Sequence, residues 1–443
     1  MPVQLPRALR PFRTAQYRIL AAALVISLLG AGTWLVALVF EVQGLGGSPI
    51  DLSFVATCNA VGLIASVLIA GVVADRVPQK RILVAVEAVK VLCFATAAVL
   101  GLSGIVEVGH LAAISFVLGV ADGFFYPAYS ALLPSLLPAE DLLPANGIEG
   151  VLRPTLMQAA GPILAGAVIA AAAPTWAFLI VAVLQLGAVG GLLLLRATPV
   201  RRELGDEAGR HPLASLVGDI RDGVRYMVRT PWFLGTLLFA LVWVLIVVGP
   251  IEVLLPYAVI RLPAAVTDPT GGPAGSYALV LAGYGLGGAL ASLAVASFRL
   301  PRRYLSVMNL VWGIGTLPLV VVGVTGELWV MIVALFLVGV SSGWGTVIWG
   351  TLLQRRVPPE MLGRVSSLDF FVSLALMPIS MAVAGPIGVA VGLGWVFLVA
   401  GAVPILLAVT ALLVFRMRAD EIAHPLDRTP PLEAEAGDPV REA

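Results

Sequence analysis

The sequence is poor in charged residues. Only 12% of its 443 residues are Asp, Glu, Lys or Arg, about half the share found in soluble domains. Hydrophobic residues make up 59% of the chain, and the mean hydropathy is +1.00. This composition excludes a soluble globular protein. The net charge of +1 gives no basis for binding nucleic acid, so we expect no nucleic-acid partner.

Cysteine, histidine and lysine are also scarce. The two cysteines, Cys58 and Cys93, both lie in apolar segments, which excludes a disulfide framework. The three histidines lie far apart without metal-ligand spacing, so we expect no metal site and no cofactor. The only lysines, Lys80 and Lys90, do not follow a phosphate-binding loop, which excludes ATP-driven transport by this chain alone.

What the chain has instead is a series of twelve apolar runs, each about long enough to cross the hydrocarbon core of a bilayer. The runs are 17–41, 51–74, 82–102, 109–133, 147–172, 175–196, 232–260, 276–298, 304–324, 328–353, 364–391 and 394–415. The sequence therefore predicts an all-α polytopic membrane protein in which twelve transmembrane helices form two six-helix bundles.

Polar segments divide the chain into four parts. Residues 1–196 form the predicted N-terminal bundle and residues 231–416 the C-terminal bundle. Residues 197–230 between them are charged and end in an amphipathic stretch, which predicts a cytoplasmic linker with a helix on the membrane surface. Residues 417–443 are rich in Pro, Glu and Asp without apolar periodicity, so we expect a disordered cytoplasmic tail.

The basic residues are distributed unevenly between the two sides of the predicted membrane. An even number of spans puts both termini on one side, and the segments on that side hold all 27 basic residues except Lys90, Arg153 and Arg261. Lys90 and Arg153 lie within predicted helices, so Arg261 is the only basic residue on the far side. The positive-inside rule therefore predicts that both termini are cytoplasmic.

The two halves also repeat each other. Ala160-Gly161-Pro162-Ile163 in the fifth run matches Ala384-Gly385-Pro386-Ile387 in the eleventh, and three further short matches recur at nearly the same offset. A parallel repeat of six helices predicts a substrate path between two bundles, near the middle of the membrane.

With these features the chain resembles the major facilitator superfamily. The segment from Gly71 to Arg81, Gly-Val-Val-Ala-Asp-Arg-Val-Pro-Gln-Lys-Arg, looks like the signature loop that latches the two halves in that superfamily. Pro78 and Gln79 depart from it, where Gly and Arg are usual. The resemblance implies a gating latch, to which we assign Gly71, Asp75, Arg76, Lys80, Arg81 and Asp369.

Two further segments resemble exporters of this superfamily. Gly161, Pro162 and Gly166 lie in Gly-Pro-Ile-Leu-Ala-Gly, which looks like the antiporter signature of the fifth helix. The stretch from Gly119 to Pro134 resembles a branch of twelve-helix drug:proton antiporters that includes macrolide, tetracycline and siderophore exporters. The resemblance implies an exporter in the bacterial cytoplasmic membrane, of the kind that confers antibiotic resistance by multidrug efflux.

Ionisable residues inside a membrane need a partner, a cavity or a proton. Asp122 and Glu252 are the candidates for proton coupling. The alternative for Asp122 is a permanent ion pair with Lys90, and the alternative for Glu252 is a side chain that reaches the outer surface. Arg153 either pairs with Glu149, four residues earlier, or reaches Asp122 or an anionic part of the substrate.

A second local pair is expected on the third helix. Glu87 and Lys90 are three residues apart on one helical face, so they favour pairing with each other.

Aromatic residues gather on the helices that line the cavity in this superfamily. Their abundance there would suit a bulky, lipophilic and possibly cationic substrate, whereas the alternative is contact with lipid. The cavity candidates are Trp34, Phe125, Tyr126, Tyr129, Arg153, Trp243 and Trp344.

We therefore expect a secondary active exporter that works by alternating access, with a small lipophilic substrate, protons and membrane lipids as its partners. We expect a monomer. We do not expect an enzyme, because the outer loops are short and nearly uncharged. The alternative with the same fold is a lipid, siderophore or small-metabolite transporter, including an importer.

Overall fold

The computed structural model describes residues 7–196, 212–263, 272–297 and 300–426. The described residues form helices without strands. Among them, twelve helical spans are long and apolar enough to cross a membrane. This confirms the predicted fold class.

The N-terminal half holds six spans. They are α1 (Ala15–Gly44), α2 (Pro49–Arg76), α3 (Gln79–Leu102), α4 (Val108–Leu136), the continuous run of α5 (Ala139–Thr155), η2 (Leu156–Ala160) and α6 (Gly161–Ala171), and α7 (Pro174–Leu193). The helix of the fifth span begins at Ala139, earlier than the predicted residue 147. The prediction missed its first turns because Glu140, Asp141 and Pro144 give them the composition of a loop.

The C-terminal half holds the other six spans. They are the run of α9 (Pro231–Gly249), η3 (Pro250–Leu254) and α10 (Leu255–Ile260), α12 (Gly272–Ser297), the pair α13 (Tyr304–Ile314) and α14 (Leu319–Val322), α15 (Leu328–Arg356), the pair α16 (Pro359–Ala375) and α17 (Met377–Val391), and α18 (Leu393–Val414). Two helices outside the spans are α8 (Pro212–Arg229) and α19 (Met417–Ala423).

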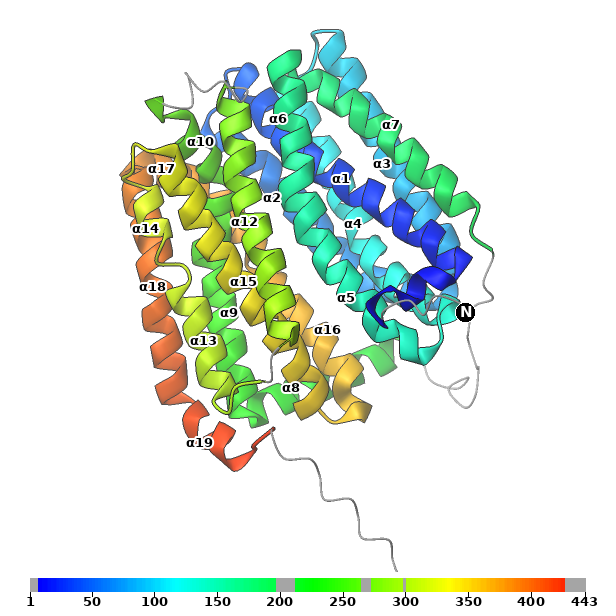
Figure 1. The fold of residues 1–443 in the computed structure, drawn as a ribbon, viewed down its shortest axis with the longest axis vertical. Helices are drawn as coiled ribbons and strands as arrows, with labels where there is room; N and C mark the ends of the chain where they lie inside the picture. The colour runs from blue at the N-terminus through cyan, green and yellow to red at the C-terminus, as the bar shows by residue number, and fades with distance from the viewer. Residues whose placement is uncertain (1–6, 197–211, 264–271, 298–299, 427–443) are drawn as a thin grey trace, which may run out of the picture.

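The helices form two bundles that lie side by side (Figure 1). Within the first half α2 packs on α4, and α7 packs on α1 and α3; within the second half α12 packs on α15, and α18 packs on α9 and α13. The bundles meet along two lines, where α2 contacts α17 and where η2 and α6 contact α12. The interface between the halves is thus made of helices from both repeats.

The apolar core differs between the two ends of the molecule. We call the end at which α1 and α13 begin, and α2 and α7 end, the terminal face, because the first and last described helices, η1 (Arg7–Arg13) and α19, lie there (Figure 1). In the half next to this face each bundle has a separate core, around Tyr17 in the first and Phe233 in the second. In the opposite half one core runs through both bundles. The bundles are therefore joined at the face opposite the termini.

Glycines and one serine make this junction close. The backbone N–H of Gly385 in α17 donates to Ser53 Oγ of α2 at 2.7 Å, and a Cβ on Gly385 would collide with the Pro49 carbonyl oxygen. On the other line, a Cβ on Gly166 would lie 3.1 Å from Ala278 Cβ. Small residues let backbones of neighbouring helices approach to this distance.

The expected disorder of the tail is wrong for its first part. Residues 417–423 form α19, whose Glu421 side chain is buried against the start of α13. The composition did not show this helix, because its partners lie in distant spans. Residues 427–443 of the tail and residues 197–211 of the predicted linker lie outside the described residues.

Candidate functional site

The carboxylate of Asp122 lies in the middle of α4 and forms an ion pair across helices. Its Oδ1 is 2.7 Å from Lys90 Nζ of α3. The Lys90 side chain is 7% exposed, whereas the Asp122 side chain is 48% exposed. A carboxylate this exposed in the middle of a membrane span would be costly against lipid. The pairing that the sequence left open for Asp122 is present.

Lys90 also has a second carboxylate beside it. Glu87 Oε1 lies 3.7 Å from Lys90 Nζ, so the local pair expected from the spacing is formed as well. Glu87 accepts hydrogen bonds from Ser27 Oγ of α1 at 2.8 Å and from Gln185 Nε2 of α7 at 2.7 Å. The ring of Phe125 covers the ammonium, with its centroid 5.0 Å from Nζ. One ammonium is thus shared by two carboxylates.

Sequence reasoning missed Ser27 and Gln185. Both are almost fully buried in spans that are otherwise apolar, and Gln185 is 1% exposed. An amide in the middle of an apolar span is a signal for a polar partner. That signal names no partner, because Glu87 lies on another helix.

Arg153 lies at the edge of the same region. Its Nη2 is 2.8 Å from Glu149 Oε1, and its guanidinium lies 5.9 Å from the ring centroid of Tyr126. Tyr126 is half exposed and is four residues after Asp122, on the same face of α4. Among the described residues no ion pair joins Arg153 to Asp122. Local pairing with Glu149 is therefore the arrangement observed.

This region borders the interface between the bundles. A Cβ on Gly285 of α12 would lie 2.7 Å from the carbonyl oxygen of Pro154, the residue after Arg153. The exposed face of α4 that carries Asp122 and Tyr126 therefore lies beside a contact between the halves.

Glu252 lies in the π-helical turn η3, where the seventh span is interrupted. Ser380 of α17 supports this turn, because its hydroxyl accepts from the Gly249 N–H and donates to the Leu245 carbonyl, both at 2.8 Å. Within the described part of the chain, Glu252 has no hydrogen bond and no ion pair. It interacts electrostatically with Tyr277 and Tyr284 of α12. π-helical turns of this kind are frequent at functional sites.

The residues assigned to the latch have separate partners. Lys80 Nζ donates to the carbonyls of Leu193, at 2.8 Å, and Leu195, so it binds the end of the sixth span. The carboxylate of Asp369 accepts from Trp349 Nε1 at 3.0 Å inside the second bundle. Arg81 is exposed. Gly71, Asp75 and Arg76 lie in the last turns of α2, and the placement of their side chains lies outside the description.

Two of the aromatic cavity candidates are core residues instead. Trp34 is 8% exposed and packs between Phe94 and Phe178 of its own bundle, with ring centroids 5.2 and 4.9 Å away. Tyr129 is 2% exposed and stacks on Phe125. Their placement does not fit the expected role in a cavity. Hydropathy could not show this, because every face of a span is apolar.

Trp243 and Trp344 stay candidates for substrate binding. Both indole N–H groups are buried, and neither has an acceptor among the described residues. A buried donor without a partner is costly, so each is a candidate for binding an oxygen atom of a substrate.

The antiporter-type residues serve as packing contacts. Gly161 lies against α1, where an added Cβ would be 2.7 Å from the Leu29 carbonyl oxygen, and Thr33 Oγ1 donates to the Gly161 carbonyl at 3.2 Å. Pro162 is buried beside it, directly after the π-helical turn η2. Gly166 contacts the other bundle. This segment therefore joins the two bundles through one bent helix.

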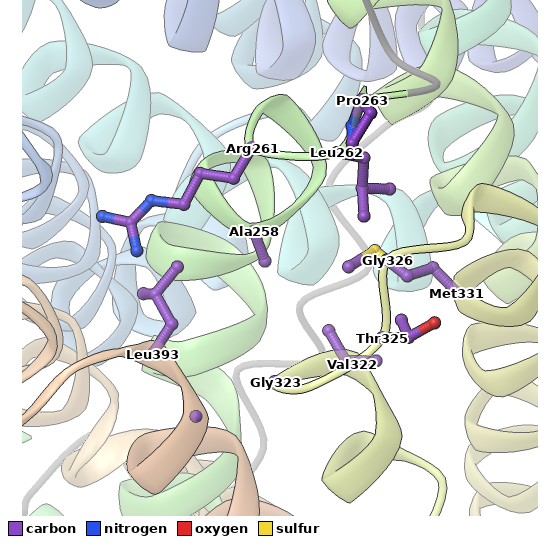
Figure 2. A pocket seen from close by; sticks show the side chains of 11 residues that line it. Ala258, Arg261, Leu262, Pro263, Val322, Gly323, Thr325, Gly326, Met331 and Leu393 are labelled. Carbon is purple, nitrogen blue, oxygen red and sulfur yellow. The ribbon is translucent and has the colours of Figure 1, made fainter.

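A small pocket lies at the face opposite the termini. Its volume is about 180 Å³. Its lining comes from the end of α10 and the residues that follow it, the end of α14 and its following loop, Met331 of α15 and the start of α18 (Figure 2). Arg261 borders it, but Asp122 and Glu252 do not. Within the described residues no group of His, Cys, Asp or Glu could hold a metal ion.

Comparison with known proteins agrees with this architecture. The family model described as "Transmembrane secretion effector", of the major facilitator type, matches residues 7–437. The chain is 26% identical over 359 residues to the enterobactin exporter EntS of Citrobacter koseri, and 25% identical over 361 residues to EntS of Escherichia coli; both alignments cover 80% of each chain.

Solved structures show the same fold at low identity. The nucleoside transporter NupG aligns with a TM-score of 0.67 at 12% identity, over 90% of this chain and 99% of its own. A POT family transporter in complex with a thioalcohol-conjugated peptide aligns with a TM-score of 0.69 at 12% identity, over 90% and 96%. The chain belongs to the major facilitator superfamily of membrane transporters, in the family of transmembrane secretion effectors.

Proposed function

We propose that this transporter is a proton-coupled exporter that moves a small lipophilic molecule out of the cell by alternating access. The observation that carries the proposal is the ion pair between Asp122 and Lys90, in which the carboxylate is half exposed and the ammonium is buried. A carboxylate in this position can take up a proton from one side and release it to the other as the bundles rearrange. Glu252 is the second candidate, because it has no partner among the described residues.

The orientation follows from the basic residues. We infer that the terminal face is cytoplasmic, since nearly all Arg and Lys residues outside the spans belong to it. The core shared by both bundles then closes the outer half, and the separate cores belong to the inner half. This arrangement fits the inward-facing state of an alternating-access cycle.

The substrate proposal rests on the aromatic and unpaired polar groups. Tyr126, Trp243, Trp344 and the Glu252 carboxylate suit a bulky, largely apolar molecule with a few polar atoms. A lipophilic drug has this chemistry. The similarity to enterobactin exporters favours a siderophore as the second candidate.

Proton flux into liposomes tests the proposal. The purified protein is reconstituted with an internal pH dye, a pH gradient is imposed, and lipophilic drugs or enterobactin are added. We expect proton movement that requires both a substrate and Asp122, with the Asp122→Asn variant as the control. Substrate transport that ignores the pH gradient would contradict proton coupling, and a response to enterobactin alone would select the siderophore.

A further inference from the structure

We propose that Glu87 is a positioning residue for coupling. Its carboxylate balances the positive charge of Lys90 while Asp122 exchanges its proton. This rests on the proposed function of Asp122. The geometry is asymmetric, because Lys90 Nζ lies 2.7 Å from Asp122 and 3.7 Å from Glu87, and the Asp122 side chain is half exposed while Glu87 is 1% exposed. The exposed carboxylate is the exchangeable member and the buried one is fixed.

A single carboxylate could not fill both roles. An unpaired ammonium in the interior of a bundle is strongly destabilised. If Asp122 were the only partner of Lys90, protonation of Asp122 would leave that ammonium uncompensated, and proton uptake would be opposed. With Glu87 in place, Asp122 binds a proton and the Glu87–Lys90 pair stays neutral. The proton leaves Asp122 again on the other side.

Glu87 is held in a fixed position by side chains of two other helices. Ser27 and Gln185 donate to its two oxygens from α1 and α7. Glu87 and Lys90 are one turn apart on α3, so this pair persists whatever Asp122 does.

The other groups packed around Asp122 leave this charge balance unchanged. From α3 the Cys93 thiol lies within electrostatic reach of Asp122. From α5 Glu149 and Arg153 neutralise each other. The neighbouring part of α2 contributes the neutral Ser66, whose hydroxyl lies beside Gly123 and donates to the Leu63 carbonyl, and α1 contributes Ser27. Two carboxylates and one ammonium therefore determine when Asp122 binds a proton.

The test is the pH at which substrate-driven proton flux is half maximal in proteoliposomes. In Glu87→Gln the repulsion between the two carboxylates is lost, so we expect this pH to fall by about one unit, with about tenfold less flux at neutral pH. In the double variant Glu87→Gln/Lys90→Met the ammonium is gone as well, so nothing stabilises the ionised form of Asp122. The pH of half-maximal flux should then rise above that of the wild type. Ser103→Ala, at the exposed C-terminal end of α3, keeps all three charges and is the matched control with a wild-type profile.

The proposal requires that the pH of half-maximal flux rises from Glu87→Gln to the wild type and again to the double variant. A structural role for Glu87 would lower the yield of folded protein without moving the profile, and a profile that stays at the wild-type pH overturns the proposal. If Glu87→Gln alone does not fold, the double variant is compared with Lys90→Met, in which Glu87 still repels Asp122. The double variant must then reach half-maximal flux at a lower pH than Lys90→Met, and equal profiles overturn the proposal. Absence of proton flux in the wild type would contradict the proposed function itself, which is a different outcome.

Discussion

Arg356 at the end of α15 holds Asp420 of α19 through two contacts, Nη1 to Oδ2 at 2.9 Å and Nη2 to Oδ1 at 3.3 Å. The same guanidinium donates to the Tyr304 hydroxyl at 2.5 Å and lies 4.9 Å from the ring centroid of Trp232. Tyr304 begins α13 and Trp232 lies in the first turn of α9. One arginine therefore connects the terminal ends of three spans to the C-terminal helix.

We expect Asp420→Asn to destabilise the protein by about 1–3 kcal/mol, because Arg356 is nearly buried and would lose a charge-assisted pair. Thermal unfolding in detergent measures this as a lower Tm. Arg418→Gln on the exposed side of α19 is the control and should leave Tm unchanged. An Asp420→Asn protein as stable as the control would show that the pair between Arg356 and Asp420 contributes nothing to stability.

Glu421 gives an independent test of the same helix. Its Oε2 accepts the backbone N–H groups of Leu305 and Ser306, both at 3.0 Å, and so caps α13. We expect Glu421→Gln to lower Tm by a similar amount, since an amide accepts these bonds less strongly than a carboxylate near a helix N-terminus. Glu421→Asp, which keeps the charge, should lose less. Equal losses in both variants would argue against the capping role.

Asp122→Asn should abolish substrate-coupled proton flux, at least about a hundredfold, because the amide cannot take up a proton. The fold should persist, because Lys90 keeps Glu87 as its counter-ion. Proton flux in liposomes and Tm in detergent are measured on the same preparation. Glu327→Gln, exposed just before α15 and without a side-chain capping bond, is the control. Wild-type flux in Asp122→Asn would remove this residue from the mechanism.

Glu252→Gln should leave Tm unchanged, because within the described residues the carboxylate has no hydrogen bond or ion pair to lose. If Glu252 binds a cationic part of the substrate, the variant should transport cationic substrates at least about tenfold more slowly than the wild type, and neutral substrates should be less affected. If Glu252 carries the coupling proton, both types should slow. Transport of both substrate types is compared in the same liposomes. Equal rates in variant and wild type would return Glu252 to a structural role.

The spans could be predicted from sequence because the bilayer imposes their length and composition. The predicted fifth span missed the first turns of α5, and the predicted tail missed α19. These segments lie outside the apolar core, where distant partners decide whether a helix forms. Arg356 and the start of α13 stabilise α19, and no local pattern in residues 417–423 reports on them.

The candidate site was predictable in its residue types but not in its pairings. Charges in apolar spans identify Asp122, Lys90 and Glu252, since each is costly there. The rotation of each helix about its axis decides which side chains meet, and apolar residues on all faces of a span leave that rotation unspecified. For this reason Trp34 was expected in a cavity although it lies in the core, and the bonds from Ser27 and Gln185 to Glu87 were missed.

The contact of Gly385 with α2 predicts how the outer junction can be opened. A side chain at this position would collide with the backbone of Pro49 and with Ser53 Oγ, so Gly385→Val should separate α17 from α2. A single cysteine placed at Ser53, which is 2% exposed, reports the change through its rate of reaction with a membrane-impermeant maleimide in a background without Cys58 and Cys93. We expect the rate to rise at least about tenfold. Gly150→Val is the control, because a Cβ there meets no atom within 4 Å. An unchanged rate in Gly385→Val would mean that α2 and α17 separate without using this contact.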